Sequence, residues 1–354
     1  MRTVLVTGAA GTVGHSVVAL AEALGYRVIA SDRWAQGVRV PLRGEVRAGD
    51  LRDRSFVEGL VRGVDAVIHT AAILDEEAPE EVLWAVNTES VAWLYQAASR
   101  AGVRRFVHVS TAMIYATGQK GAITEEGSIA PRGIHGQTKL EAERILQSQR
   151  GRGAPWTIVR AAPIYGRRGR HFAAILLAIG PALRLFTPLL PRPHGGPLHC
   201  FVHAEDVARA LIHLLEKEEA AWGIFNVAEE NPLSIGDRLA ITFDAYGLAT
   251  FPCGPLPRLW LHALSRAGQK AWGHRAIDAL LVSAYHLVVM RHGLKPALRA
   301  RIGKEALTLL VDDLVLDTSR LRATGWKARF PRFADGWRDV LRWYQAEGWA
   351  PRYT

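Results

Sequence analysis

Three glycines close to the amino end have the spacing of a turn that holds a diphosphate. Gly8, Gly11 and Gly14 follow the β-branched run Thr3–Thr7 and precede an apolar helical run from Val17 to Leu24. Gly8 would permit the tight turn, Gly11 the close approach of the backbone to a pyrophosphate, and Gly14 the packing of the helix on the sheet. A strand, glycine turn and helix in this order are typical of a dinucleotide-binding unit, although the GxxGxxG spacing is not the commoner GxGxxG and a surface turn is the alternative.

An acidic residue closes the next strand and supports the same prediction. Asp32 follows the run Arg27–Ser31. Its carboxylate would accept hydrogen bonds from a ribose 2′-OH and would repel a 2′-phosphate, which favours NAD over NADP. Arg33 comes directly after it and could pair with a phosphate, so NADP stays the alternative cofactor.

These residues depend on elements that alternate along the first half of the chain. Strand-like and helix-like runs follow one another, which predicts an α/β fold with a Rossmann-type, doubly wound parallel sheet. Ligands lie outside the carboxyl ends of such strands, so the residues that follow the strands would line one crevice. The expected strands are Thr3–Thr7, Arg27–Ser31, Glu45–Ala48, Asp65–His69, Arg104–Val109, Trp156–Arg160 and Ile224–Val227. The expected crevice residues are Gly8 to Gly14, Asp32, Asp50, Ala71, Ala72 and Thr111.

The regular alternation stops after Pro163, where the chain becomes loop-rich and basic. It resumes over residues 204–227, and from Asn231 onward the chain reads as helices punctuated by proline and tryptophan. We therefore predict an NAD(P)-binding domain of residues 1–163 and 204–227. Residues 164–203 and 228–354 would form a smaller, mostly helical substrate lobe that covers the crevice.

The basic residues are concentrated in two stretches. The chain has 44 Lys and Arg against 34 Asp and Glu, a formal net charge of +10, yet no acidic residue lies between residues 144 and 204 and only Asp278 lies between residues 245 and 304. Such stretches attract an anionic substrate, nucleic acid or an anionic membrane surface, and solvated basic faces are the alternative. Because no recognised nucleic-acid-binding module is present, we expect a small, anionic substrate or a peripheral membrane contact.

Cysteines, apolar runs and histidines narrow the class of protein further. Cys200 and Cys253 form no disulfide framework, the N-terminus enters a strand at once, and the longest apolar runs are broken or too short to cross a bilayer, so we expect a cytoplasmic protein. No spacing among histidines and cysteines makes a metal site. His69, His108 and His203 lie on or beside strands and are expected to be satisfied core histidines.

Further motifs follow in order along the chain. They are Thr7–Gly14, Gly49–Leu51, His69–Ala72, Asn87, Val109–Tyr115, Gly136–Glu143, Arg160–Gly166 and Phe201–Ala208. With them the chain resembles the extended short-chain dehydrogenase/reductase family, the NAD-dependent epimerase/dehydratase superfamily, over essentially its whole length. The resemblance implies an enzyme with a pyridine dinucleotide cofactor.

The resemblance also implies roles for single residues. Asp32 would hold the adenosine ribose, and Asp50 and Leu51 the adenine. Lys139 would bond the nicotinamide ribose, and Thr111 would orient the substrate oxygen. The implied cofactor-binding set is Gly8, Gly11, Thr12, Val13, Gly14, Asp32, Arg33, Asp50, Leu51, Ala71, Ala72, Asn87, Lys139 and Pro163.

One catalytic position departs from the family. The family's YxxxK pair has a tyrosine four residues before the lysine, where this chain has His135 before Lys139. Imidazole titrates near neutral pH and can exchange protons, although a nearby ammonium would favour its neutral form. Three hypotheses follow: His135 is the proton donor, the site binds cofactor but catalyses weakly or not at all, or another group such as Tyr115 or Tyr165 takes the role. Both tyrosines match positions that are usually structural in the family.

Two stretches resemble the 3β-hydroxysteroid dehydrogenase-like branch of the family. They are Arg160–Gly166, which has Pro163 where nucleotide-sugar epimerases usually have asparagine, and the ending from Leu316 to Tyr344. The branch implies an NAD(P)-dependent oxidoreductase with the catalytic residues Thr111, His135 and Lys139. Its substrate would be a secondary alcohol or ketone of a hydrophobic or acyl-linked compound.

Two other functions and one assembly remain as hypotheses. The chain could be a nucleotide-sugar epimerase or dehydratase, or an NAD(P)-binding sensor or scaffold in which His135 marks lost catalysis. By analogy with the family, the helices at about Glu80–Gly102 and Ile134–Gln149 would pair across a two-fold axis in a homodimer.

Overall fold

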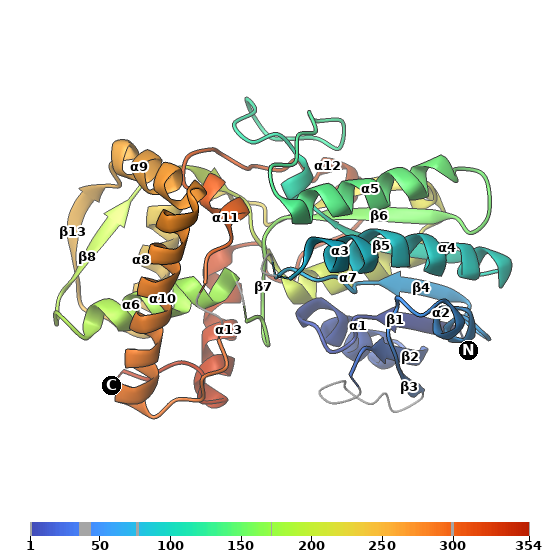
Figure 1. Cartoon of the computed structure of the whole chain (residues 1–354), viewed down its shortest axis with the longest axis horizontal. Helices are drawn as coiled ribbons and strands as arrows, with labels where there is room; N and C mark the ends of the chain where they lie inside the picture. The colour runs from blue at the N-terminus through green and yellow to red at the C-terminus, as the bar shows by residue number, and fades with distance from the viewer. Residues whose placement is uncertain (1, 35–43, 76–77, 171, 299–300, 354) are drawn as a thin grey trace.

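A seven-stranded parallel sheet forms the centre of the larger lobe. The computed structural model describes residues 2–34, 44–75, 78–170, 172–298 and 301–353 (Figure 1). Every neighbouring pair of strands is parallel, which confirms the predicted doubly wound α/β fold. In sheet order the strands are β11 (Gly223–Val227), β6 (Trp156–Ala161), β5 (Arg105–Thr111), β4 (Ala66–His69), β1 (Thr3–Thr7), β2 (Arg27–Asp32) and β3 (Glu45–Ala48).

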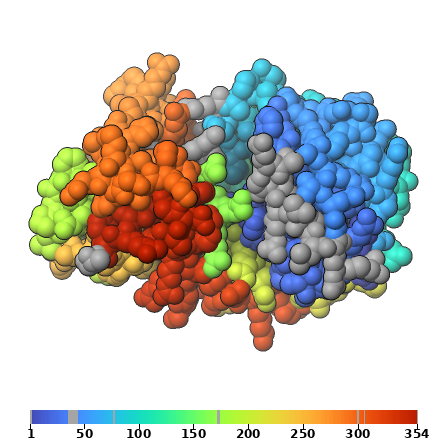
Figure 2. Space-filling model, turned by 90° about the horizontal axis from the view of Figure 1, so that it is seen from below, coloured from blue at the N-terminus to red at the C-terminus, as the bar shows by residue number. Residues whose placement is uncertain are grey.

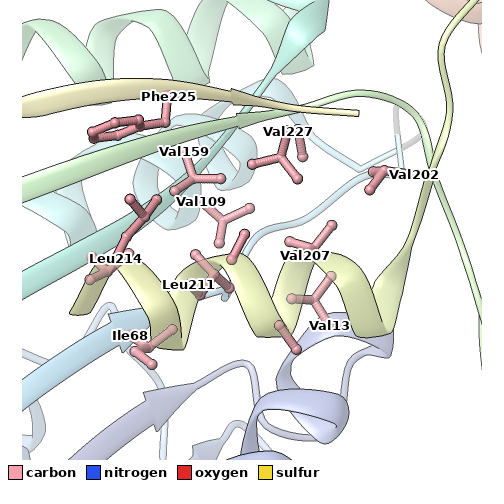
Figure 3. Packing of buried hydrophobic residues seen from close by; sticks show 14 of the residues in the cluster. Val13, Ile68, Val109, Val159, Val202, Val207, Leu211, Leu214, Phe225 and Val227 are labelled. Atoms are coloured by element: carbon pink, nitrogen blue, oxygen red, sulfur yellow. The ribbon is translucent and has the colours of Figure 1, made fainter. Parts of the chain in front are cut away.

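Helices cover both faces of this sheet, because successive side chains of a strand point to opposite faces. In β1, Val4 and Val6 belong to the core on one face and Leu5 to the core on the other. Figure 3 shows the first core, where Leu211 and Leu214 of α7 meet strand residues such as Val109 and Val159. The helical segments of this lobe are α1 (Thr12–Ala23), α2 (Arg54–Leu60), α3 (Glu80–Trp84), η1 (Ala85–Glu89), α4 (Ser90–Arg100), η2 (Ala112–Ile114), α5 (Ile134–Ser148), α7 (Ala204–Glu216), η3 (Glu218–Ala220) and α12 (Ser319–Ala323).

The long helix expected at Glu80–Gly102 is not uniform. Its middle, η1, is a π-helical turn between α3 and α4. Such turns often occur at functional sites, because they place one side chain out of the regular helical register. Here the turn contains Asn87, which is fully buried.

The second lobe packs beside the carboxyl ends of the sheet strands (Figure 1). Its own core contains the aromatic side chains of Tyr165, Phe243, Phe333 and Trp337. The lobe is not purely helical, because the proline-rich segment β13 (Thr250–Pro255) pairs in parallel with β8 (Leu190–His194). Proline excludes this segment from a helix interior but is tolerated at a sheet edge.

The other segments of this lobe are short strands and longer helices. The strands are β7 (Ile164–Tyr165), β9 (Leu198–His199), β10 (Val202–His203) and β12 (Leu233–Ser234). The helices are α6 (Phe172–Arg184), α8 (Ile235–Tyr246), α9 (Arg258–Gln269), α10 (Ala271–His292), α11 (Lys304–Thr308) and α13 (Phe333–Ala346).

Candidate active site

The glycine turn between β1 and α1 is closed too tightly for any side chain. Gly8 has φ +71°, and a Cβ atom there would lie 2.7 Å from the Cα atom of Ala71. A Cβ atom on Gly14 would lie 2.1 Å from the carbonyl oxygen of Gly8. Gly11 precedes α1 without a side-chain cap, so the first N–H groups of the helix face the cleft. The turn therefore fits a diphosphate, which binds to such N–H groups.

Two carboxylates lie where an adenosine would be expected, at the carboxyl ends of β2 and β3. Asp32 accepts hydrogen bonds from the N–H groups of Ala10, at 3.0 Å, and Arg33, at 2.8 Å. Asp50 forms an ion pair with Arg52, and the hydrogen bond from that guanidinium lowers the pKa of the carboxyl below its ordinary value. The guanidinium of Arg33 lies 3.5 Å from Asp50, so a carboxylate already faces the cation that would receive a 2′-phosphate. Leu51 packs on the neighbouring core.

Asn87 has a different position from the one that the resemblance implied. Its side chain does not line the cleft but accepts from Ile73 N at 2.8 Å and donates to Ile73 O at 3.0 Å. The same Nδ2 lies 3.2 Å from Thr138 Oγ1. Its side-chain polar atoms thus join the segment after β4 to α5, which is the arrangement of a positioning residue, and its implied role as a cofactor ligand stays a prediction. Ala71 backs Gly8, whereas Ala72 lines the cleft.

One cleft of about 1460 Å³ joins the glycine turn to the second lobe. It brings together Thr111 at the end of β5, His135 and Lys139 on the first turns of α5, and Pro163 after β6. A volume above the roughly 300–1,000 Å³ of ordinary ligand pockets leaves room for a dinucleotide and a second molecule. Thr111 Oγ1 accepts a hydrogen bond from Met113 N at 3.2 Å, which leaves the hydroxyl proton free for donation.

His135 is held in its neutral form. Desolvation, assisted by the Lys139 cation, lowers its pKa to about 4, and a backbone contact with Ile73 opposes the shift. Its Nδ1 atom is buried and has no hydrogen-bond partner among the described residues. Desolvation also lowers the pKa of Lys139 to about 7, while Glu143 raises it. At neutral pH the imidazole can therefore accept a proton at one ring nitrogen and donate a hydrogen bond from the N–H of the other. Beside it lies a partly charged lysine.

The residues behind Lys139 show that Tyr115 does not replace the missing tyrosine. Glu143, one turn after Lys139, is buried and paired with Arg160 at 2.7 Å. Arg160 Nη1 donates to the Tyr115 hydroxyl at 2.8 Å, and that hydroxyl donates to Asn226 at 2.8 Å. Burial raises the pKa of Tyr115 to about 12.

Tyr165 is also a structural residue. It lies in the aromatic core of the second lobe, against Phe333 and Trp337, and burial raises its pKa well above its ordinary value. Neither tyrosine lines the cleft. Tyr115 and Tyr165 are therefore structural residues, and neither of them supports the third hypothesis, that another group takes the role of the proton donor.

The core histidines are not all satisfied. His69 and His108 are fully buried and stacked, with ring centroids 5.4 Å apart. His69 Nδ1 meets Thr7 Oγ1 at 2.7 Å, and His203 accepts from Glu205 N as the cap of α7. Both ring nitrogens of His108 and the Nε2 atoms of His69 and His203 lack a hydrogen-bond partner in the described part of the chain, so the prediction of satisfied histidines is wrong for His108 and holds for only one nitrogen of the other two. Burial keeps the pKa of His108 well below its ordinary value.

Two arginines of the site were not singled out from the sequence. Arg170 and Arg275 line the cleft from the second lobe, and neither forms an ion pair with another described residue. The acid-free stretches that contain them were the available signal. Arg170 precedes α6 and Arg275 lies on α10, and these two helices pack against each other, so the position of both arginines depends on the packing of the second lobe, which the sequence does not reveal.

Comparison with solved structures places the fold among dinucleotide-binding proteins. A short-chain dehydrogenase/reductase superfamily protein of Agrobacterium tumefaciens, solved with bound NAD, is 26% identical with a TM-score of 0.60, over 72% of this chain and 86% of that one.

Three named proteins are similar to the chain in sequence. A 3-diazoavenalumate denitrifying reductase of a Streptomyces species is 31% identical over 78% of this chain and 94% of the relative. Sterol demethylase protein B of Methylococcus capsulatus is 35% identical over 46% of this chain and 52% of its own length. A 3β-hydroxysteroid dehydrogenase/Δ5→4-isomerase of Mycobacterium tuberculosis is 32% identical over 46% of this chain and 47% of its own. The chain thus spans about half the length of the last two proteins.

The family model for NAD dependent epimerases and dehydratases matches residues 4–228. This range includes the glycine turn, Thr111, His135, Lys139 and the buried pair of Glu143 and Arg160. The chain therefore belongs to the NAD-dependent epimerase/dehydratase family, as its motifs predicted, and is an enzyme of the extended short-chain dehydrogenase/reductase type.

Proposed function

We propose that the protein is an NAD-dependent oxidoreductase that interconverts a secondary alcohol and a ketone on a hydrophobic substrate with an anionic end. The observation that carries this proposal is a cleft lined by Thr111, His135 and Lys139 together with the glycine turn and an apolar, cationic wall. NAD is the preferred cofactor because Asp32 and Asp50 gather at the adenosine end. Bound NAD would supply the hydride acceptor, and the chain would supply orientation and proton transfer.

The three polar side chains would divide the work at the substrate oxygen. The Thr111 hydroxyl has its proton free, so it would donate a hydrogen bond to that oxygen. Neutral His135 would accept the proton of an alcohol during oxidation and become imidazolium, and in the reverse direction the imidazolium would return that proton to the substrate oxygen during reduction. Lys139 would bond the ribose and keep the imidazole neutral.

The second lobe supports the choice of substrate class. Ile175, Val282 and Tyr285 give the cleft an apolar wall, and Arg170 and Arg275 add two cations without ion-pair partners among the described residues. A carboxylate or phosphate on an otherwise apolar molecule would satisfy both features. Two relatives have names that refer to a sterol or a steroid, and such compounds are largely apolar, which supports this substrate class.

The test is turnover of a substrate panel by the purified protein with NAD or NADH. The panel contains hydroxy and keto acids, sterol acids, acyl thioesters and UDP-sugars. We expect His135→Gln to lower kcat by roughly 10²- to 10⁴-fold, the usual range for a general acid–base, and Arg275→Gln to raise KM with little change in kcat. Epimerisation of a UDP-sugar without net consumption of NAD would contradict the proposal and favour the epimerase.

A sensor or scaffold function would give a different result. It predicts NAD binding without turnover of any panel member, and no activity gained by His135→Tyr. The homodimer through α4 and α5 is also a proposal, and sedimentation of the protein as a monomer would contradict it.

A further inference from the structure

Helices α9 and α10 carry large apolar side chains that face solvent. The exposed fractions are 78% for Leu259, 75% for Trp260, 67% for Trp272, 71% for Leu280 and 71% for Met290. Single exposed apolar residues are common, but a cluster with two tryptophans on consecutive helices marks an interaction surface. We call these five residues and Leu287 the apolar face. The orange segment of Figure 2 includes these helices, on the outside of the second lobe.

The residues of α10 in this face share one side of the helix. Trp272, Leu280, Leu287 and Met290, with Ala276 and Ser283 between them, recur at intervals of three and four residues. The opposite side, with Gly273, Tyr285 and Val288, is buried in the lobe. A surface helix ordinarily has one apolar side and one polar side, so the second apolar side of α10 requires an apolar medium of its own.

The exposed charges that α9, α10 and the residues flanking them carry are basic. Arg258, Arg266, Lys270, Arg291 and Lys295 are exposed and form no ion pair with any described residue. The only acidic residue between residues 245 and 304 is Asp278, which lines the cleft and accepts a hydrogen bond from Ile302 N at 3.1 Å. The face is therefore complementary to a surface that is anionic outside and apolar beneath.

We propose that α9 and α10 dock the protein on the surface of an anionic lipid bilayer. Tryptophan prefers the headgroup boundary, leucine and methionine enter the acyl region below it, and each Lys or Arg near an anionic leaflet adds to the attraction. None of the described helices is long and apolar enough to span a membrane.

The docked helix α10 is also a wall of the cleft. Its residues Asp278, Val282 and Tyr285 line the cleft, so the cleft would open beside the bilayer. Delivery of a membrane-borne substrate rests on the proposed function, whereas the docking itself does not. A vesicle-binding assay therefore tests docking even if no substrate is turned over.

The experiment is co-sedimentation of the full chain with vesicles of phosphatidylcholine alone or mixed with phosphatidylglycerol. We expect binding to the mixed vesicles that weakens as salt is added, because the cations contribute. Leu280→Glu should lower the partition coefficient about tenfold or more, since it removes apolar contact and adds repulsion. The matched control is Leu24→Glu, because Leu24 is 59% exposed but lies on the other lobe, and it should bind like the unaltered protein.

A second measurement separates insertion from charge attraction alone. Brominated acyl chains should quench tryptophan fluorescence in the unaltered protein, and the double variant Trp260→Phe, Trp272→Phe should lose most of this quenching. Absence of binding to the mixed vesicles, or equal binding by both glutamate variants, would overturn the proposal. So would a dimer in lipid-free solution that Leu280→Glu dissociates, because that result assigns the face to a second copy of the chain.

Discussion

Lys139 should take up a proton when NAD binds. Burial lowers the pKa of Lys139 to about 7, so at neutral pH the free protein is a nearly equal mixture of ammonium and amine. The anionic diphosphate and the ribose hydroxyls both favour the ammonium, which raises the pKa of Lys139 on binding. Binding and protonation are therefore linked.

The size of the linkage follows from that pKa. If the bound state returns Lys139 to its ordinary pKa of about 10.4, uptake should be about 0.1 proton at pH 6, about 0.5 at pH 7 and about 0.9 at pH 8. The sign is fixed, because the lowered pKa belongs to the free protein. The Kd for NAD should then rise with pH, by about five- to sixfold from pH 7 to pH 8 and by close to tenfold per unit above pH 8.

Titration calorimetry in buffers with different heats of ionisation measures this uptake directly. Lys139→Met should abolish it at every pH. His135→Gln is the matched control, because His135 has a pKa of about 4 and is already neutral from pH 6 to pH 8. An uptake near zero at pH 8, or an unchanged uptake in Lys139→Met, would refute the placement of Lys139 at the bound cofactor.

Three further predictions concern the scaffold. Gly8→Ala should lose more stability than Gly25→Ala in urea titrations, by about 1–3 kcal/mol, because both have positive φ but only Gly8 faces a close backbone contact; equal losses would contradict this. Arg160→Met should lower the free energy of unfolding by about 3–5 kcal/mol, because it leaves Glu143 buried and unpaired. The double variant with Glu143→Leu should recover much of this free energy. A small loss in the single variant would count against the ion pair. The free energy of unfolding should fall as the pH drops from 6.5 to 4, because four histidines have lowered pKa values in the folded protein and take up protons only when it unfolds. This loss should exceed the opposite effect of Glu229, whose pKa burial raises to about 7. Equal free energies of unfolding at pH 7 and pH 5 would contradict the prediction. The four histidines are His69, His135, His199 and His203.

The parts of the fold that depend on local patterns were predictable. The strand at Thr3–Thr7 and the glycine turn after it could be predicted from residues that are neighbours in the sequence. The turn requires glycine, because only glycine accepts the φ of Gly8 and the close contact at Gly14. The alternation of strand and helix predicted a parallel, doubly wound sheet, but it did not fix the order of the strands within that sheet. The π-turn at Asn87 was not predictable, since it depends on bonds to Ile73 and to Thr138, which lies 51 residues away.

Some features of the site could likewise be predicted from the sequence, and others only from the tertiary structure. The sequence by itself determined which residues follow the strands, and thereby placed Thr111 and the glycines at one edge of the sheet. Only the tertiary structure decided which arginines form ion pairs. Arg160 pairs with Glu143 in the core, whereas Arg170 and Arg275 line the cleft without an ion-pair partner among the described residues. It also decided that His135 is neutral, because a pKa depends on burial and on charges brought near by distant segments, and neither is written in the spacing of residues along the chain.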